Sequence, residues 1–200
     1  MKNYITLELA KNYGFEWTKY TTDRMNEQIK ELENFKDLCT IIPMVNYSEY
    51  DDKKHFEHIT VFIDFKGVLL RPYKRYNEKS FEFSLAESLY VPSFNHNLEA
   101  PQKVGKPTEK KLLAWVEYLQ NVELLKIEKI NERKNKETEF LDKIKNSGLK
   151  VSHQSNDGKR GYIITEFFEF SFEILNDGYI NQSIRLTKSG TIDTFLELIK

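Results

Sequence analysis

The sequence predicts an α+β protein made of two antiparallel β-meanders, each packed with helix and joined through a long helical segment. Apolar and polar residues alternate around 57–65 and again around 168–174, as in strands with one buried face. Between them, apolar residues recur every three to four positions over much of 109–146, the spacing of an amphipathic helix. We expect an N-terminal α+β unit (1–100), a linker and long helical segment (101–147) and a C-terminal β-meander with a terminal helix (148–200), an arrangement also compatible with one continuous domain.

Composition indicates a folded chain without a strong overall field. Hydrophobic residues make up 40% of the 200 residues and aromatic residues 14%, which is enough for a sizeable core. The 30 Lys and Arg against 31 Asp and Glu give a net charge of -1, so overall charge predicts no tight non-specific binding to nucleic acid or anionic lipid. A charged partner must therefore be bound by a local patch.

The sequence favours a reducing, aqueous compartment. Cys39 is the single cysteine and cannot form an intramolecular disulfide, so we expect it to be a small buried hydrophobe at a helix end. Glu8 and Lys11 interrupt the stretch where a signal peptide would need its apolar core. No run approaches the ~20 apolar residues of a membrane-spanning helix. We therefore expect a cytoplasmic protein without membrane contact.

The first forty residues predict two helices. YITLELAKNYGF (4–15) predicts a short helix ended by Gly14, with ITLEL (5–9) as an alternative edge strand. A second helix is expected over 22–39, where Thr22 or Asp23 can cap its first N–H groups and Pro43 prevents continuation. Its apolar stripe comprises Met25, Ile29, Leu32, Phe35 and Leu38.

The next segment predicts a three-stranded antiparallel meander that begins near Glu57. Turns at FKG (65–67) and NEK (77–79) separate the alternating first strand from VLLRPYKRY (68–76) and from SFEFSLAESLY (80–90), which begins as a strand. Pro72 fits only where the middle strand needs no ladder donor. A stretch with three prolines, 92–108, is the best candidate for a linker.

The second half predicts a helix followed by a second meander. Thr108 is the expected N-cap, while NERKNKETE (131–139) is either a solvated length of one helix or a break between two. Gly148 suits a C-terminal cap, and a strand is expected from Leu149. NDG (176–178) predicts a hairpin turn, and 192–199 a short helix. The residues expected in the second core are Phe168, Phe170, Phe172 and Ile174, with Glu169 and Glu173 facing water.

One N-terminal stretch resembles the first half of a DNA-binding helix-turn-helix. In LELAKNYGF (7–15), Leu9, Ala10 and Gly14 stand where that motif has an apolar residue, alanine and the turn glycine. The resemblance implies DNA binding by the helix that follows. The second half departs from the pattern, because Tyr20 and Asp23 stand where the motif needs small or branched apolar residues, and a helix ended by glycine explains the same letters.

RPYKRYNEK (71–79) is the main candidate binding segment. It concentrates cations and tyrosines in a chain of balanced charge, and its candidate contact residues are Arg71, Tyr73, Lys74, Arg75, Tyr76 and Lys79. A period of two would place Leu69, Arg71, Tyr73 and Arg75 on one face of a strand and Leu70, Pro72, Lys74 and Tyr76 on the other.

Three interpretations of this segment remain open. Guanidinium groups flanking an aromatic ring can hold phosphates and stack a base, as sheet surfaces do when they bind single strands. The same residues also suit an exposed strand end, where charge prevents edge-to-edge aggregation. The third interpretation is an edge that binds a protein partner.

The pair His55 and His58 is the best candidate for chemistry, with Asp64 close in sequence. Zinc needs three or four converging ligands, and positions three apart at the entry to a strand face opposite sides. We therefore expect no metal and no cofactor, with both histidines in solvent-facing loops. No nucleophile elbow, P-loop or dinucleotide fingerprint is present in the sequence, and an enzyme would need a pocket assembled near these three residues.

The sequence thus favours a non-catalytic protein that binds a macromolecule, either a protein or a nucleic acid. An enzyme with a pocket near His55, His58 and Asp64 is the alternative. By association from composition alone, the aromatic-rich and Lys/Asn/Ile-rich chain is typical of bacterial or phage accessory proteins, such as an inhibitor of a host or defence factor. The partner and the oligomeric state are not indicated.

Overall fold

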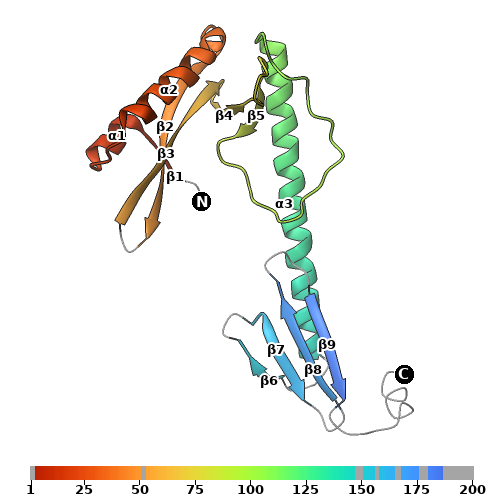
Figure 1. The fold of residues 1–200 in the computed structure, drawn as a ribbon. Helices are drawn as coiled ribbons and strands as arrows, with labels where there is room; N and C mark the ends of the chain where they lie inside the picture. The colour runs from red at the N-terminus through yellow and green to blue at the C-terminus, as the bar shows by residue number, and fades with distance from the viewer. Residues whose placement is uncertain are drawn as a thin grey trace. The chain divides into compact units, whose positions relative to one another are not determined.

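The computed structural model confirms the α+β class with two antiparallel meanders and a long helix that joins them (Figure 1). It describes residues 3–50, 53–146, 151–155, 158–164, 168–175 and 180–186. The chain divides into two compact units, residues 1–90 with 96–125 and residues 91–95 with 126–200. The division falls within helix α3 (Glu109–Asn146), which contributes to both units.

The first unit is built on a five-stranded sheet in which every strand pairs with the strand next to it in sequence. Its order is β1-β2-β3-β4-β5, and each pair is antiparallel. The strands are β1 (Asn3–Thr6), β2 (Thr40–Tyr50), β3 (Lys53–Phe65), β4 (Val68–Tyr73) and β5 (Glu82–Leu85).

Both alternatives for the N-terminal stretch occur in succession. Strand β1 leads directly into helix α1 (Leu7–Asn12), which Thr6 caps by accepting a hydrogen bond from the Leu9 N–H at 3.2 Å. Gly14 follows with a φ of 77°, a left-handed conformation that glycine adopts without strain. The resemblance of this stretch to a DNA-binding motif stays a prediction.

Helix α2 (Lys19–Glu31) corrects the expected 22–39 at both ends. Thr18 is the N-cap, accepting a hydrogen bond from the Thr21 N–H at 3.3 Å. This cap was not expected, because the apolar stripe of the helix begins only at Met25 and does not reach the first turn. After Leu32 the chain tightens into the 3-10 turn η1 (Glu33–Phe35). The expected stripe is confirmed: Leu32 and Phe35 are buried in the core, with Met25, Ile29 and Leu38 packed against it.

Strand β2 was not expected, because Pro43 indicated only the end of a helix. Pairing with β1 ends at Thr6↔Met44, so Pro43 has a neighbouring strand only on the β3 side. In the β3–β4 hairpin, Phe65 and Ile63 exchange hydrogen bonds with β4, so Val61, two residues further on, also directs its N–H and C=O groups away from β2. Pro43 and Val61 are therefore paired without exchanging hydrogen bonds. The missing N–H of Pro43 therefore leaves no gap in the ladder.

A β-bulge interrupts β3 at Glu57. Asn46 pairs with His58 while the next residue of β2, Tyr47, pairs with Phe56, so Glu57 is the extra residue. The bulge reverses the alternation beyond it, and Phe56 comes to the same face as Ile59. There the Phe56 ring stacks on Trp17, with ring centroids 6.2 Å apart.

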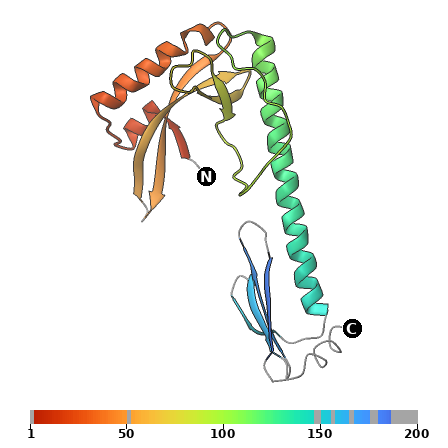
Figure 2. The same ribbon diagram turned by 45° about the vertical axis from the view of Figure 1, so that its right-hand side comes forward.

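The core of the first unit lies on the face of the sheet that α2 crosses (Figure 2). Phe83 is 1% exposed, and its ring lies 6.0 Å from that of Phe35 and 5.5 Å from that of Trp115 on α3. The Trp115 indole N–H donates to the Gln102 carbonyl at 3.0 Å, and Val104 pairs with Phe81. Part of the expected linker is thus attached to the core of this unit.

Helix α3 is continuous, which settles the alternative left open for 131–139. Thr108 is confirmed as its N-cap residue by the hydrogen bond from the Lys111 N–H, at 3.4 Å. In the second unit, the Arg133 guanidinium donates to the Pro92 carbonyl at 2.9 Å. Among the described helices, none combines the length and the apolar composition that crossing a bilayer requires.

The second unit contains an antiparallel sheet in the order β6-β7-β8-β9, formed by β6 (Val151–Gln154), β7 (Arg160–Ile164), β8 (Phe168–Ile174) and β9 (Ile180–Leu186). Phe172 and Ile174 are buried, and Phe172 packs edge-on against Phe140 of α3, with centroids 5.4 Å apart. Phe170 is half-buried against Phe172, and Glu173 pairs with Arg160 at 2.7 Å. The Phe168 side chain, Gly148, Leu149, the turn at 176–178 and the helix at 192–199 lie outside the described residues.

Candidate partner-binding groove

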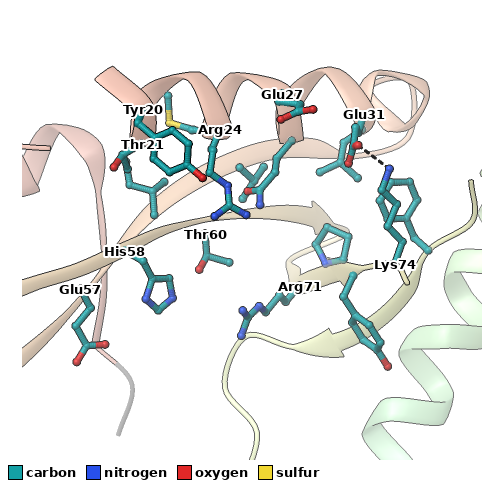
Figure 3. Close-up of a pocket in the computed structure, with 18 of the residues that line it drawn as sticks. Tyr20, Thr21, Arg24, Glu27, Glu31, Glu57, His58, Thr60, Arg71 and Lys74 are labelled. Carbon is teal, nitrogen blue, oxygen red and sulfur yellow. Dashed lines mark hydrogen bonds and ion pairs between the residues drawn. The ribbon is translucent and has the colours of Figure 1, made fainter. Parts of the chain in front are cut away.

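A cavity of about 670 Å³ opens in the first unit between α2, β3 and β4 (Figure 3). Six consecutive residues of β3, 56–61, line it, and so do four consecutive residues of the segment 71–74. Successive side chains of a strand point to opposite faces, so a run of consecutive residues can line one cavity only at the edge of the strand. The cavity is therefore a groove between the facing edges of two strands.

Pro72 accounts for the separation of these strands. Pairing of β3 with β4 ends at Ile63↔Leu70, and two residues later β4 reaches Pro72, which pairs with Phe83 of β5 instead. In a continued ladder Pro72 would stand opposite Val61, but it has no N–H to donate across the pair. The sheet splits at this point, and β4 continues with β5 alone.

The split leaves one edge of β3 open. The Lys66 and Gly67 turn has φ values of 53° and 80°, as in a two-residue hairpin, so Phe65 and then Ile63 exchange hydrogen bonds with β4. The backbone groups of every second residue of β3 point to this same side, so the N–H and C=O groups of Ile59 and Val61 are directed toward the groove. Within the described parts of the chain, no strand pairs with β3 on this side between Phe56 and Phe62.

Two guanidinium groups reach this groove without a carboxylate partner among the described residues. Figure 3 shows Arg24 extending from α2 and Arg71 extending from β4. Arg24 lies over the Tyr20 ring, 5.9 Å from its centroid, and neither arginine forms an ion pair within the described ranges of the chain. Register places Arg71 on the opposite face from Leu70, which is in the core beneath α2. The two cations therefore approach the groove from opposite faces of the sheet.

The other charged groups of the groove are one lysine and three carboxylates, of which Lys74 and Glu31 neutralise each other. Lys74 pairs with Glu31 of α2 at 2.6 Å, with its ammonium 5.6 Å from the centre of the Phe81 ring. The Glu57 carboxylate accepts a hydrogen bond from the buried Asn46 amide at 2.5 Å. Glu27 on α2 is the remaining carboxylate of the lining and is exposed. Once Lys74 and Glu31 are set aside, the lining therefore has two arginines and two carboxylates, Glu27 and Glu57, and its positive charge is local to the arginine side chains.

Comparison of the chain with family models, with curated proteins and with solved structures gave no match. The groove must therefore be interpreted from its own geometry.

The structure divides the predicted binding segment into two parts. Arg71, Tyr73 and Lys74 line the groove, and register keeps Arg71 and Tyr73 on one face as expected. Strand β4 ends at Tyr73, so the expected alternation does not continue to Arg75 and Tyr76, which lie in the following loop. Lys79 is exposed in the same loop.

Acidic neighbours offset part of the positive charge of this segment. Burial, followed by the hydrogen bond to Glu82, raises the pKa of Tyr73 to about 12. The Lys103 ammonium lies 2.7 Å from a Glu78 carboxylate oxygen and 2.8 Å from one of Glu82. The hydrogen bond from Lys103 is the main cause that lowers the pKa of Glu82. Consequently, the loop beside the groove does not present a continuous positive surface.

The histidine pair differs from its expected placement. Both residues lie within β3 rather than in loops, and the bulge at Glu57 brings them to the same face, opposite Ser48 and Asn46. His55 stacks on Tyr50, with centroids 3.8 Å apart, while His58 is exposed at the groove. Asp64 lies nine residues from His55 along the strand, or ~30 Å at the usual rise, and accepts a hydrogen bond from the Gly67 N–H at 2.8 Å.

The enzyme alternative therefore lacks its expected cluster, since His55 and Asp64 are far apart. In the part of the chain that the structure describes, no group of three or more His, Cys, Asp or Glu side chains could hold a metal ion. Asp51 and Asp52 lie outside the described residues.

The contribution of α2 to the groove was not expected from the sequence. Tyr20, Arg24, Glu27 and Glu31 recur at intervals of three to four residues and form one polar face of the helix above the groove. This spacing is present in the sequence, but the helix was interpreted only from the apolar residues on its other face. The convergence of Arg24 with Arg71 depends on the pairing of distant strands and had no local signal.

Proposed function

We propose that the protein is a non-catalytic binding protein whose groove between α2, β3 and β4 recognises acidic side chains of a protein partner. The observation that carries the proposal is the pair of guanidinium groups, Arg24 and Arg71, that reach one groove and have no carboxylate partner in the part of the chain that the structure describes. Arginine binds carboxylates through two parallel hydrogen bonds, which gives both affinity and orientation. A groove walled by a helix and two strand edges adds shape selectivity to this charge.

A protein partner fits this surface better than a nucleic acid. Binding of single strands requires a positive groove that follows the phosphates, together with rings for base stacking. Here Lys74 is paired with Glu31, and the Tyr73 hydroxyl is bonded to Glu82. Glu27 and Glu57 would repel any anion placed beside them, phosphate or carboxylate, so an anionic partner can be held only at the two arginines and not along the whole groove. These features support recognition of a few carboxylates rather than a phosphate chain.

The test is to capture partners from lysate of the cells that make the protein with the wild type and with two matched double variants. Arg24→Ala with Arg71→Ala removes the unpaired groove cations, whereas Lys110→Ala with Lys134→Ala removes two exposed cations of α3 that do not line the groove. The groove variant should weaken binding of the captured, purified partner about tenfold or more, as loss of a charged hydrogen bond does. Equal affinity of both variants would refute the proposal.

A nucleic-acid-binding protein is the second candidate. It is supported by the loop after β4, where Tyr76 is 94% exposed and Arg75 and Lys79 are also exposed. Fluorescence anisotropy with short single-stranded DNA and RNA tests it. This candidate would be favoured if binding weakens as salt is added, and if Arg75→Ala reduces the slope of log binding constant against log salt concentration by roughly one unit. The association with bacterial or phage accessory proteins, inhibitors included, stays a prediction from composition.

A further inference from the structure

We infer that the partner enters the groove as an extended acidic peptide and adds a β-strand to the open edge of β3. This inference rests on the proposed function and specifies how the partner binds. Its geometric basis is the split between β3 and β4, where the Ile59 and Val61 backbone groups point into the groove and no described strand pairs with them.

An unpaired strand edge is a template for an incoming chain. Main-chain hydrogen bonds supply affinity in strand addition, and pockets for alternate side chains supply specificity. From Phe56 to Val61 the lining run of β3 extends ~17 Å, which accommodates a peptide of roughly six residues. The missing N–H of Pro72 keeps β4 from closing this edge itself.

The positions of the two arginines indicate the side chains of the peptide. Arg24 approaches from the face that α2 covers, and Arg71 from the opposite face. A strand between them would direct successive side chains alternately toward α2 and away from it. Two acidic residues at an odd separation would therefore meet one arginine each, whereas an even separation would place both on the same face.

The remaining titratable groups of the groove limit where the acidic side chains can bind. Glu31 is neutralised by Lys74, whereas Glu57 keeps its negative charge because its partner Asn46 is a neutral amide, and it would repel an acidic side chain near residue 57. His58 lies on the face of β3 away from α2. Glu27 is one turn of α2 beyond Arg24 and would repel a second carboxylate there. The geometry thus favours one acidic side chain per face rather than a polyacidic run.

Amide hydrogen exchange of the free protein tests the open edge. Ile59 should exchange much faster than its neighbour Thr60, whose N–H is directed to β2 by the same alternation. Equal protection of the two amides in the free protein would show that the β3 edge is already paired and would overturn the inference.

Binding is tested with a phage-displayed library of random peptides, selected on the full-length wild type and counter-selected on Arg24→Ala with Arg71→Ala. We expect enrichment of peptides with two acidic residues at an odd separation, and slower Ile59 exchange when a selected synthetic peptide is bound. N-methylation of the peptide backbone at every second residue should weaken binding at least tenfold, while N-methylation at the residues between should leave it unchanged.

The outcomes separate this inference from the proposed function. Peptides that need both arginines but leave Ile59 exchange unchanged, or that tolerate every N-methyl group, would refute strand addition and leave the acidic groove standing. If no peptide is enriched in an arginine-dependent manner, both the inference and the protein-binding proposal fail. Binding of single-stranded nucleic acid in that case would identify the alternative partner.

Discussion

Phe83→Ala tests the arrangement of the first unit most directly. The Phe83 side chain is 1% exposed, and its ring contacts both Phe35 of η1 and Trp115 of α3. Truncating a buried Phe costs about 3–5 kcal/mol, and two edge-on ring contacts place this site toward the upper end of that range. Because small domains have a free energy of unfolding of about 5–15 kcal/mol, the loss is a large share of the total.

Tryptophan fluorescence during urea unfolding provides the assay. The protein has two tryptophans, Trp17 and Trp115, and both belong to the first unit, so the signal follows that unit alone. Tyr76→Ala is the matched aromatic control, because its ring is 94% exposed and its loss should change the unfolding free energy by no more than about 0.5 kcal/mol. Should Phe83→Ala cost under about 1 kcal/mol, or no more than Tyr76→Ala, the core would be misassigned.

Three further predictions concern the second unit, the thiol and the Tyr73 hydroxyl. Phe172→Ala should cost the second unit about 3–5 kcal/mol by circular dichroism yet leave the tryptophan transition in place; a shift of that transition would show that the units unfold together. Burial, and to a smaller extent the negative charge of Asp64, raises the pKa of Cys39 from 9.0 to about 11. The neutral thiol therefore stabilises the folded state fully below pH 9, and this stabilisation is lost as pH rises through about 11. Iodoacetamide should therefore alkylate native Cys39 slowly near neutral pH and quickly in urea, and equal rates would contradict its burial. Glu82→Gln should lower the pKa of Tyr73 from about 12 toward its ordinary value of 10, seen as phenolate absorbance that Tyr73→Phe removes; an unchanged titration would mean that burial alone sets it.

Local patterns predicted those elements whose signal lies within a few residues. The alternation from Ile59 to Phe65 identified the middle of β3, and the stripe from Met25 to Leu38 identified the buried side of α2 and η1. Thr108 was identified as a cap because a free hydroxyl before an apolar periodic run satisfies N–H groups of the first turn.

The features that were missed depend on contacts between distant segments. Strand β2 tolerates Pro43 only because β1 ends one pair earlier, and no local pattern reports where a partner strand stops. The groove likewise depends on Pro72 falling where a continued β3–β4 ladder would need an N–H opposite Val61, and on α2 crossing above the gap that results. The basic segment was noticed for its charge, but pairing with Glu31 and Glu82 from other elements decides which of its residues remain available.

The bulge at Glu57 means that the outer part of the β2–β3 hairpin does not depend on this residue for its register. Deleting Glu57 would join Phe56 to His58 in plain alternation, so Phe56 would stay opposite Tyr47 and His55 opposite Ser48. Straightening the bulge with Glu57 retained would instead pair Glu57 with Tyr47 and turn Phe56 to the other face, away from Trp17. Natural variants of the chain should therefore accept an exchange or the loss of this one residue, at the cost of the hydrogen bond from Asn46, so that the length of the arm is free to vary by one residue here.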